Sequence, residues 1–343
     1  MALVNLYSDT QTRPTDAMRQ VMAAAEVGDE QRFEDPTVTA LCERVAALLG
    51  QEAAVFLPSG TMCNTIAFRL HIRPGGDEVI LHRTAHPIVA EAGSPGALAG
   101  ANLHPLDGEG GRFDAEQLRA ALRPPGDRYQ PRSRLLHLEQ TTNIAGGRIW
   151  PLGQIRAVLA AASEAGLRTH LDGARLLNAV VATGVPAEDW AEEFDTAWID
   201  FTKGLGAPLG ACLAGSRETI VEAWRYKQML GGSLRQAGIV AAAALHALDH
   251  HVERLAEDHA RAARLAVGLA ELPGIVLDPA TVETNIVVFG VDDAPRLVAA
   301  LEDDHDVRMG ALDARTVRAV THLDIDDAGI ERALSAARAV VGG

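Results

Sequence analysis

The chain has 343 residues, of which 48% are hydrophobic and 22% charged, and its formal net charge is −15. This length and apolar content allow a large buried core in about two domains and exclude an intrinsically disordered chain. The acidic balance without a basic run argues against nucleic acid as a partner, and the longest apolar run, near residues 239–245, is too short to cross a membrane.

The first two thirds of the chain alternate short apolar runs with helical patterns. A helix over residues 37–49 is predicted from Asp35 and Pro36 before it and Gly50 after it, since these are ordinary start and stop signals. The predicted strands are residues 53–57, 78–81, 135–138, 168–171, 196–201 and 210–214, and the helices between them include 114–122 and 152–164. This alternation predicts an α/β fold with a mainly parallel sheet sandwiched by helices.

The pattern changes after Ser216. Long helices are predicted over residues 218–229 and 236–272, followed by short strands at 284–289 and 317–322, a helix near 294–302 between these strands, and a last helix over 327–340. This mixture predicts a smaller α+β C-terminal domain. We expect residues 1–240 to form a large domain with an N-terminal arm and residues 241–343 to form the small one.

The three cysteines, Cys42, Cys63 and Cys212, are far apart and form no CxxC pair. A disulfide scaffold or zinc site is therefore not expected, and a reducing compartment fits. The acidic run 302–306 and the histidines His250 and His251 are interpreted as surface features, so no metal is expected. The first residues lack the basic and apolar segments of a secretory signal, and we expect a cytoplasmic protein.

The chain uses arginine almost everywhere that it needs a positive charge. Among its 31 basic residues, Lys203 and Lys227 are the only lysines. A lysine amine can lose its proton and attack a carbonyl, which a guanidinium cannot do. Lys203 follows a predicted strand, whereas Lys227 lies in a predicted helix and is interpreted as a solvated side chain.

Three segments follow predicted strands at their carboxyl ends, where open parallel sheets bind ligands. They are Asp172, Lys203 and the turn Ser59-Gly60-Thr61, which opens a helix. Each has an ordinary alternative, because Asp172 could cap a helix and Ser-Gly-Thr turns are common. Together they fit pyridoxal phosphate, which needs a lysine for its aldehyde, a carboxylate for its ring nitrogen and a cradle for its phosphate.

With these residues noted, the sequence resembles the low-specificity L-threonine aldolases, which are pyridoxal-phosphate enzymes of the aspartate-aminotransferase fold type (fold type I). The resemblance covers nearly the whole chain and includes the segments YSDTQTRPTDAM, FLPSGT, AHPIVAEAG, HLDGARLLNA, KGLGAPLG, GGSLRQAG and RAVTHLD. HLDGAR and KGLG at this distance from each other make the match specific.

The resemblance implies roles for individual residues. Lys203 is expected to bond the cofactor aldehyde, Asp172 to pair with the ring nitrogen, and His86 to stack on the ring face and take part in catalysis. The other implied cofactor ligands are Ser59, Gly60, Thr61, Arg175 and Arg235, the last reaching in from a neighbouring subunit. The groups implied for the substrate carboxylate are Ser8, Arg175 and Arg318, because arginine donates to a carboxylate in a matching fork.

Two positions depart from the family pattern. Thr142 stands where the family has a histidine, and threonine cannot serve as a base near neutral pH. Arg32 stands where the family has a tyrosine. Because the family places both near the substrate side chain, we expect Arg32 and Thr142 to contact the substrate and threonine not to be the preferred one. Alternatively, Arg32 pairs with Glu34 or Asp35. The base is then expected to be His86 or a bound water.

The implied reaction cleaves the Cα–Cβ bond of an L-β-hydroxy-α-amino acid, such as threonine or allo-threonine, to glycine and an aldehyde. The expected assembly is a homodimer or homotetramer with shared active sites. Two alternatives stay open at this point. One is a related pyridoxal-phosphate reaction, which could be β-elimination, racemisation or transaldolation, and the other is a binding protein without turnover.

Overall fold

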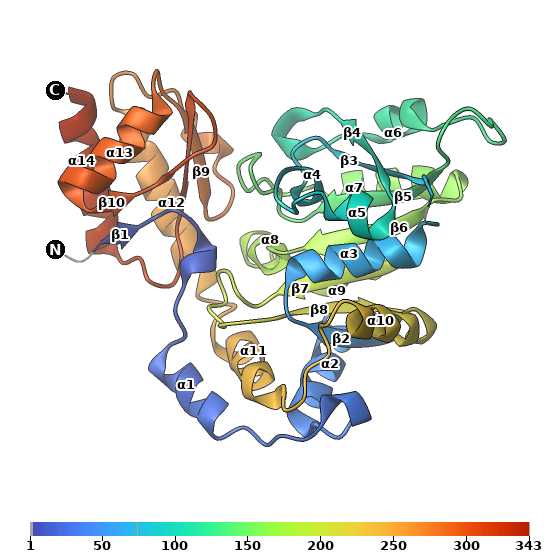
Figure 1. Ribbon diagram of the computed structural model, residues 1–343. Helices are drawn as coiled ribbons and strands as arrows, with labels where there is room; N and C mark the ends of the chain where they lie inside the picture. Colours follow the sequence, from blue (N-terminus) through green and yellow to red (C-terminus); the bar gives the residue numbers. More distant parts are fainter. Residues whose placement is uncertain (1–2, 74, 343) are drawn as a thin grey trace.

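The computed structural model describes residues 3–73 and 75–342 and shows a larger and a smaller body (Figure 1). The central sheet of the larger body has the strand order β2-β8-β7-β6-β5-β3-β4. β8 runs antiparallel to β2 and β7, whereas the other neighbouring pairs are parallel. The strands are β2 (Ala53–Leu57), β3 (Glu78–His82), β4 (Asn102–Leu106), β5 (Ser133–Glu139), β6 (Arg168–Gly173), β7 (Thr196–Asp200) and β8 (Ala211–Gly215).

Helices cover both faces of this sheet because successive strand residues point to opposite sides. In β2, Val55 and Leu57 join the apolar cluster under α3 and α10, whereas Phe56 between them joins the cluster on the other face. The helices are α1 (Asp16–Ala23), α2 (Pro36–Leu48), α3 (Gly60–His71), α4 (His86–Val89), α5 (Ser94–Ala99), α6 (Ala115–Ala121), α7 (Leu152–Glu164), α8 (Leu176–Thr183), α9 (Ala187–Ala191), α10 (Arg217–Met229) and α11 (Gly238–His250).

The smaller body combines helices with short strands. Its elements are α12 (Leu255–Ala270), β9 (Ile286–Gly290), α13 (Ala294–His305), β10 (Val307–Arg308), β11 (Gly310–Ala311), β12 (Thr316–Val320) and α14 (Asp327–Gly342). The chain's first strand, β1 (Val4–Asn5), pairs in parallel with β10 and lies beside it in Figure 1. None of the helices in the described part of the chain combines the length and apolar character of a membrane span.

Two separate apolar clusters bear on the expected division of the chain. The larger cluster takes residues from Met18 to Leu255, including those of α11, and the smaller one takes Val4, Leu6 and residues from Ala262 onward. The division at residue 240 stays a prediction, but these contacts place α11 with the larger core.

The predicted strands and helices occur, and the structure adds strands that were not predicted, namely β1, β4, β10 and β11. The long helical region 236–272 is two helices, α11 and α12. His251, expected at the surface, is buried between them and contacts the Leu205 carbonyl oxygen through Nδ1 at 2.7 Å. The sequence of β4 contains Pro105, and proline is tolerated there because β4 is an edge strand.

Lys227 is buried, so its interpretation as a solvated side chain is wrong. Its Nζ lies 2.8 Å from the carboxylate of Glu30, and both side chains are fully buried. Nζ also lies 4.2 Å from the ring centre of Trp224. Glu30 accepts the backbone N–H of Leu234 as well, so the pair ties α10 to the segment that precedes α11. This lysine therefore has a structural role.

Removal of this buried amine should destabilise the fold. In Lys227→Met the Glu30 carboxylate loses its partner inside the protein, and we expect the free energy of unfolding to fall by about 3 kcal/mol. Urea unfolding measures it. The double variant Lys227→Met/Glu30→Gln should recover part of the loss, since it leaves no unpaired charge. A single variant as stable as the wild type would contradict the role of the pair.

Candidate active site

A cavity of about 650 Å³ lies at the carboxyl ends of the parallel strands. The ends of β5, β6 and β7, the start of α3 and the N-terminal segment all contribute to its wall. The residues predicted for the site that line it are Ser8, Ser59, Gly60, Thr61, His86, Asp172, Arg175, Lys203 and Arg318. The topology thus brings together most of the predicted site, as expected for an open parallel sheet.

Lys203 supplies the primary amine among the described residues of the cavity wall. It lies in the turn after β7, and its Nζ pairs with the carboxylate of Asp200. Nζ also lies 5.6 Å from the ring centre of Trp198. The backbone carbonyl of Lys203 accepts a hydrogen bond from the Thr12 hydroxyl at 3.1 Å, which fixes the turn. The amine is therefore held at the cavity wall by its own strand end.

Asp172 is a buried carboxylate with both oxygens engaged. Oδ1 accepts the backbone N–H of Ala174 at 3.0 Å, and Oδ2 accepts Nδ2 of Asn64 at 3.0 Å. It does not cap α8, whose N-cap position is Arg175. These two hydrogen bonds fix the orientation of the carboxylate.

The start of α3 forms a cradle of backbone N–H groups. Ser59 is its N-cap, and the Ser59 hydroxyl oxygen accepts the backbone N–H of Met62 at 3.3 Å. A Cβ atom on Gly60 would lie 2.2 Å from a ring carbon of Trp198, so only glycine lets the helix begin this close to the ring. With Thr61 beside it, this helix start can hold a phosphate.

His86 begins α4, and its ring is oriented by a buried acid. Its Nδ1 lies 2.8 Å from Oε1 of Glu91, and its backbone N–H donates to the carboxylate of Glu139. Burial opposes the charged imidazole, but the hydrogen bond to Glu91 and the nearby charge of Asp172 outweigh it and raise the pKa of His86. The ring contributes to the cavity wall, which leaves Nε2 available to a ligand.

Two arginines give the cavity an excess of positive charge on one side. Arg175 is buried and donates to both oxygens of Asp9 at 2.8 and 2.6 Å. Arg318 donates to Oδ1 of Asn143 at 3.0 Å, but its buried Nε has no hydrogen-bond partner. Burial and the positive charge of Arg175 lower the pKa of Arg318. An anion bound here would accept a hydrogen bond from Nε of Arg318 and would offset the positive charge of the two arginines.

Three residues predicted for the site do not line the cavity. Arg32 is exposed and pairs with Glu34 at 2.9 Å, as the alternative interpretation had it. Thr142 is buried, and its hydroxyl oxygen accepts the backbone N–H of Arg148 at 3.0 Å. Arg235 is exposed and pairs with Asp29 at 3.0 Å. Substrate contacts by Arg32 and Thr142 therefore find no support in the arrangement of this chain.

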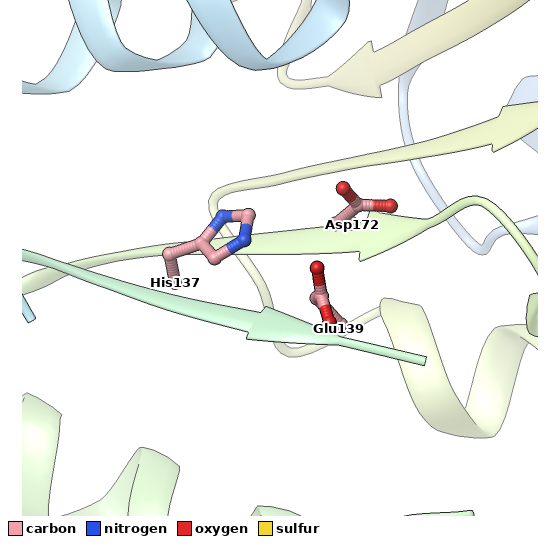
Figure 2. Close-up of side chains that lie close together, drawn as sticks. All are labelled: His137, Glu139 and Asp172. Carbon is pink, nitrogen blue, oxygen red and sulfur yellow. The ribbon is translucent and has the colours of Figure 1, made fainter. Parts of the chain in front are cut away.

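Sequence reasoning missed the acidic partner of Asp172. Glu139 ends β5 and stands opposite Asp172 of β6 in the parallel register, so both carboxylates reach the same edge. Figure 2 shows Glu139 and Asp172 close together, with His137 nearby. The signal was available, because Glu139 and Asp172 each directly follow a predicted strand, residues 135–138 and 168–171. Asn64, Glu91 and Asp9 were also missed, since nothing local in the sequence links them to the site.

The pKa of Glu139 is raised to about 8, first by burial and then by the charge of Asp172. One ligand atom each from His137, Glu139 and Asp172 lies within 4.8 Å of the others, a spacing that could hold a metal ion. The expectation that the protein binds no metal stays a prediction.

The chain matches the beta-eliminating lyase family over residues 5–292. It is 39% identical to low-specificity L-threonine aldolase 1 of Arabidopsis thaliana over 98% of this chain and 95% of the relative. It is 38% identical to the low specificity L-threonine aldolase of Escherichia coli K12, over 94% and 95% of the two chains. This chain belongs to the low-specificity L-threonine aldolase family. The expected family and its lyase class are thus confirmed.

The solved structure of Leishmania major threonine aldolase has the same fold. It superposes with a TM-score of 0.83 and 20% identity, covering 98% of this chain and 99% of that one. The expected α/β fold of type I, with its mostly parallel sheet between helices, is confirmed as the fold of this threonine aldolase family member.

Glu139 should make the stability of the fold depend on pH. Its pKa is about 8 in the folded chain against an ordinary value of 4.5, so its contribution is complete below pH 4.5 and is lost as the pH rises through 8. We expect Glu139→Gln to lose less stability than the wild type between pH 5 and 8, by at least about 1 kcal/mol. Urea unfolding at both pH values checks this, and equal losses would contradict it.

Proposed function

We propose that this chain binds pyridoxal phosphate and cleaves the Cα–Cβ bond of an L-β-hydroxy-α-amino acid to glycine and an aldehyde. The observation that carries the proposal is one cavity in which the Lys203 amine, the fixed Asp172 carboxylate and the start of α3 face a common space. Membership in a family whose relatives are named L-threonine aldolases supports the same reaction.

The donors of the cavity fit this cofactor. The Lys203 amine would bond its aldehyde, Asp172 would accept from its ring nitrogen, and Gly60 and Thr61 would hold its phosphate. The glycine cradle supports this assignment, because any side chain at Gly60 would collide with Trp198. When bound, pyridoxal phosphate takes up the electron pair that remains when the Cα–Cβ bond breaks.

The two arginines and Ser8 are assigned to the substrate carboxylate. The unpaired Nε of Arg318 is a buried donor without an acceptor, and such a group costs free energy until a ligand satisfies it. Arg175 cannot move toward the ligand freely, because Asp9 holds it in a two-point ion pair. The carboxylate would therefore be received by a rigid pair of guanidinium groups, which fixes the orientation of the bond to be broken.

We assign the β-hydroxyl proton to Nε2 of His86, either directly or through a bound water. Glu91 holds Nδ1 of the ring, so the imidazole presents its other nitrogen to the cavity. The neutral ring accepts the proton, and Glu91 then stabilises the charged ring. Because Thr142 and Arg32 lie outside the cavity wall, the reason for expecting a substrate other than threonine loses its support.

We also propose a cytoplasmic homodimer or homotetramer with shared active sites. Cys42, Cys63 and Cys212 are all free thiols, which fits a reducing compartment. Arg235 lies at the surface, 63% exposed in its side chain. This position leaves its guanidinium within reach of a second copy, in keeping with the expectation that it serves a neighbouring subunit.

The reaction is tested by its products and its lysine. Incubation with threonine, allo-threonine and other β-hydroxy amino acids should yield equimolar glycine and aldehyde by mass spectrometry, whereas β-elimination would yield a keto acid. Borohydride reduction of the loaded protein should attach the pyridoxyl group to the peptide bearing Lys203. We expect Lys203→Ala to lose this adduct and at least about 10³-fold in kcat, because the covalent step is lost. Lys227→Arg, with its charge retained, should keep the adduct.

The role of His86 is tested by the pH dependence of kcat. The rate should rise with pH through the raised pKa of His86, because only the neutral ring accepts a proton. Glu91→Gln removes the charge that raises this pKa, so the rising limb should move to lower pH. His86→Asn should lower kcat by about 10²-fold and abolish the limb. A limb unchanged in Glu91→Gln would assign the titration to another group.

A further inference from the structure

A continuous chain of hydrogen bonds runs through the larger body from the amino ends of the parallel strands to their carboxyl ends. It begins at His71, which lines a second cavity of about 760 Å³ at the amino ends of the strands. Nε2 of His71 and Nδ1 of His170 both lie 2.8 Å from the hydroxyl of Thr196, and Nε2 of His170 lies 3.1 Å from Oδ1 of Asn64. These residues come from α3, β6 and β7.

Asn64 connects this chain to the candidate active site. Its Nδ2 donates to Oδ2 of Asp172 at 3.0 Å and to Oε1 of Glu91 at 2.7 Å. The same oxygen of Glu91 holds Nδ1 of His86 at 2.8 Å. A single amide group therefore touches both the residue assigned to the ring nitrogen and the acid that orients the imidazole.

Trp198 and the two carboxylates indicate the direction of the hydrogen bonds in this chain. Nε1–H of Trp198 can only donate, and it donates to Oδ1 of Asn64 at 2.8 Å. The carboxylates on the other side can only accept, so Nδ2 must face them. Oδ1 is then an acceptor toward His170 as well, which places the His170 proton on Nε2. Nδ1 of His170 must accept from the Thr196 hydroxyl.

The remaining members follow the same direction. Since the Thr196 hydroxyl proton points to His170, its oxygen accepts from His71, which carries its proton on Nε2. Burial lowers the pKa of His170 well below its ordinary value and that of His71 to about 4, so both rings are neutral. Every donor thus points toward the carboxylates of the active site.

We propose that Asn64 is a positioning residue for this site, and that its amide, oriented by Trp198 and His170, holds Asp172 and Glu91 in the geometry that the cofactor requires. The inference rests on the proposed function. Asparagine suits this place because two donors and two carboxylates meet there. Aspartate would have no proton to give the carboxylates, and an apolar residue would leave Trp198 Nε1, His170 Nε2 and Asp172 Oδ2 without this partner.

The test compares two asparagine-to-leucine variants that are expected to lose a similar amount of thermal stability. Asn178 is also buried in a helix of the larger body, but its side-chain Nδ2 contacts Nε2 of His259 at 3.1 Å rather than a carboxylate of the site. Asn64→Leu should raise the dissociation constant for pyridoxal phosphate by at least about tenfold, as expected for a lost hydrogen bond to a charged group. Asn178→Leu should stay within about twofold of the wild type at a similar loss of thermal stability. Equal affinities in the two variants would overturn the proposal.

A second measurement uses the wild-type protein, and a histidine variant is needed only to assign the NMR signals. Nitrogen-15 NMR of histidine-labelled protein should show His170 neutral between pH 6 and 8, with its proton on Nε2, as the bond directions require. A proton on Nδ1, or a charged ring, would overturn the proposal even if Asn64→Leu failed to fold. If the wild type itself did not bind pyridoxal phosphate, the proposed function would fail, and the tautomer would still report on the orientation of Asn64.

Discussion

The buried carboxylate of Asp172 is the constraint from which much of the larger body follows. A charged group in the interior costs several kcal/mol unless hydrogen bonds replace its lost hydration. Here a backbone N–H and the Asn64 amide supply them, and Asn64 in turn needs Trp198 and His170. Side chains of α3 and β7 are therefore committed to one acid on β6. The interior polar groups form a network because each one needs the next.

On the opposite side of the cavity, the positive charge of the two arginines is compensated only in part. Asp9 satisfies Arg175 there, and the Arg175 guanidinium keeps the pKa of Asp9 well below its ordinary range despite burial. Arg318 has no carboxylate, and its Nε is left without an acceptor. Native interiors leave few such groups unpaired. The unpaired donor marks the place where the protein depends on a ligand to complete its hydrogen bonding.

Sequence reasoning recovered the sheet and its carboxyl edge because both have local signals. Strands such as β5, β6 and β7 are short apolar runs, and Asp172 lies at the end of β6 and Lys203 in the turn after β7. The residues that it missed act across the fold: Asn64 meets Glu91 and Asp172 only after α3 packs on the sheet. It also misjudged Lys227, whose burial depends on Glu30 far away in the sequence. Thr142 was misplaced by one position, since its neighbour Thr141 lines the cavity, whereas the Thr142 hydroxyl oxygen accepts the backbone N–H of Arg148.

The parallel pairing of Val4 with Val307 has a consequence for biosynthesis. The segment that follows β1 brings Ser8 and Asp9 to the cavity, while its own strand partner lies near the other end of the chain. Contacts between such distant segments form late and slow the search for the native state. During translation the emerging polypeptide can therefore close its large sheet early, but Asp9 is not secured against Arg175 until the ribosome has released almost the whole chain.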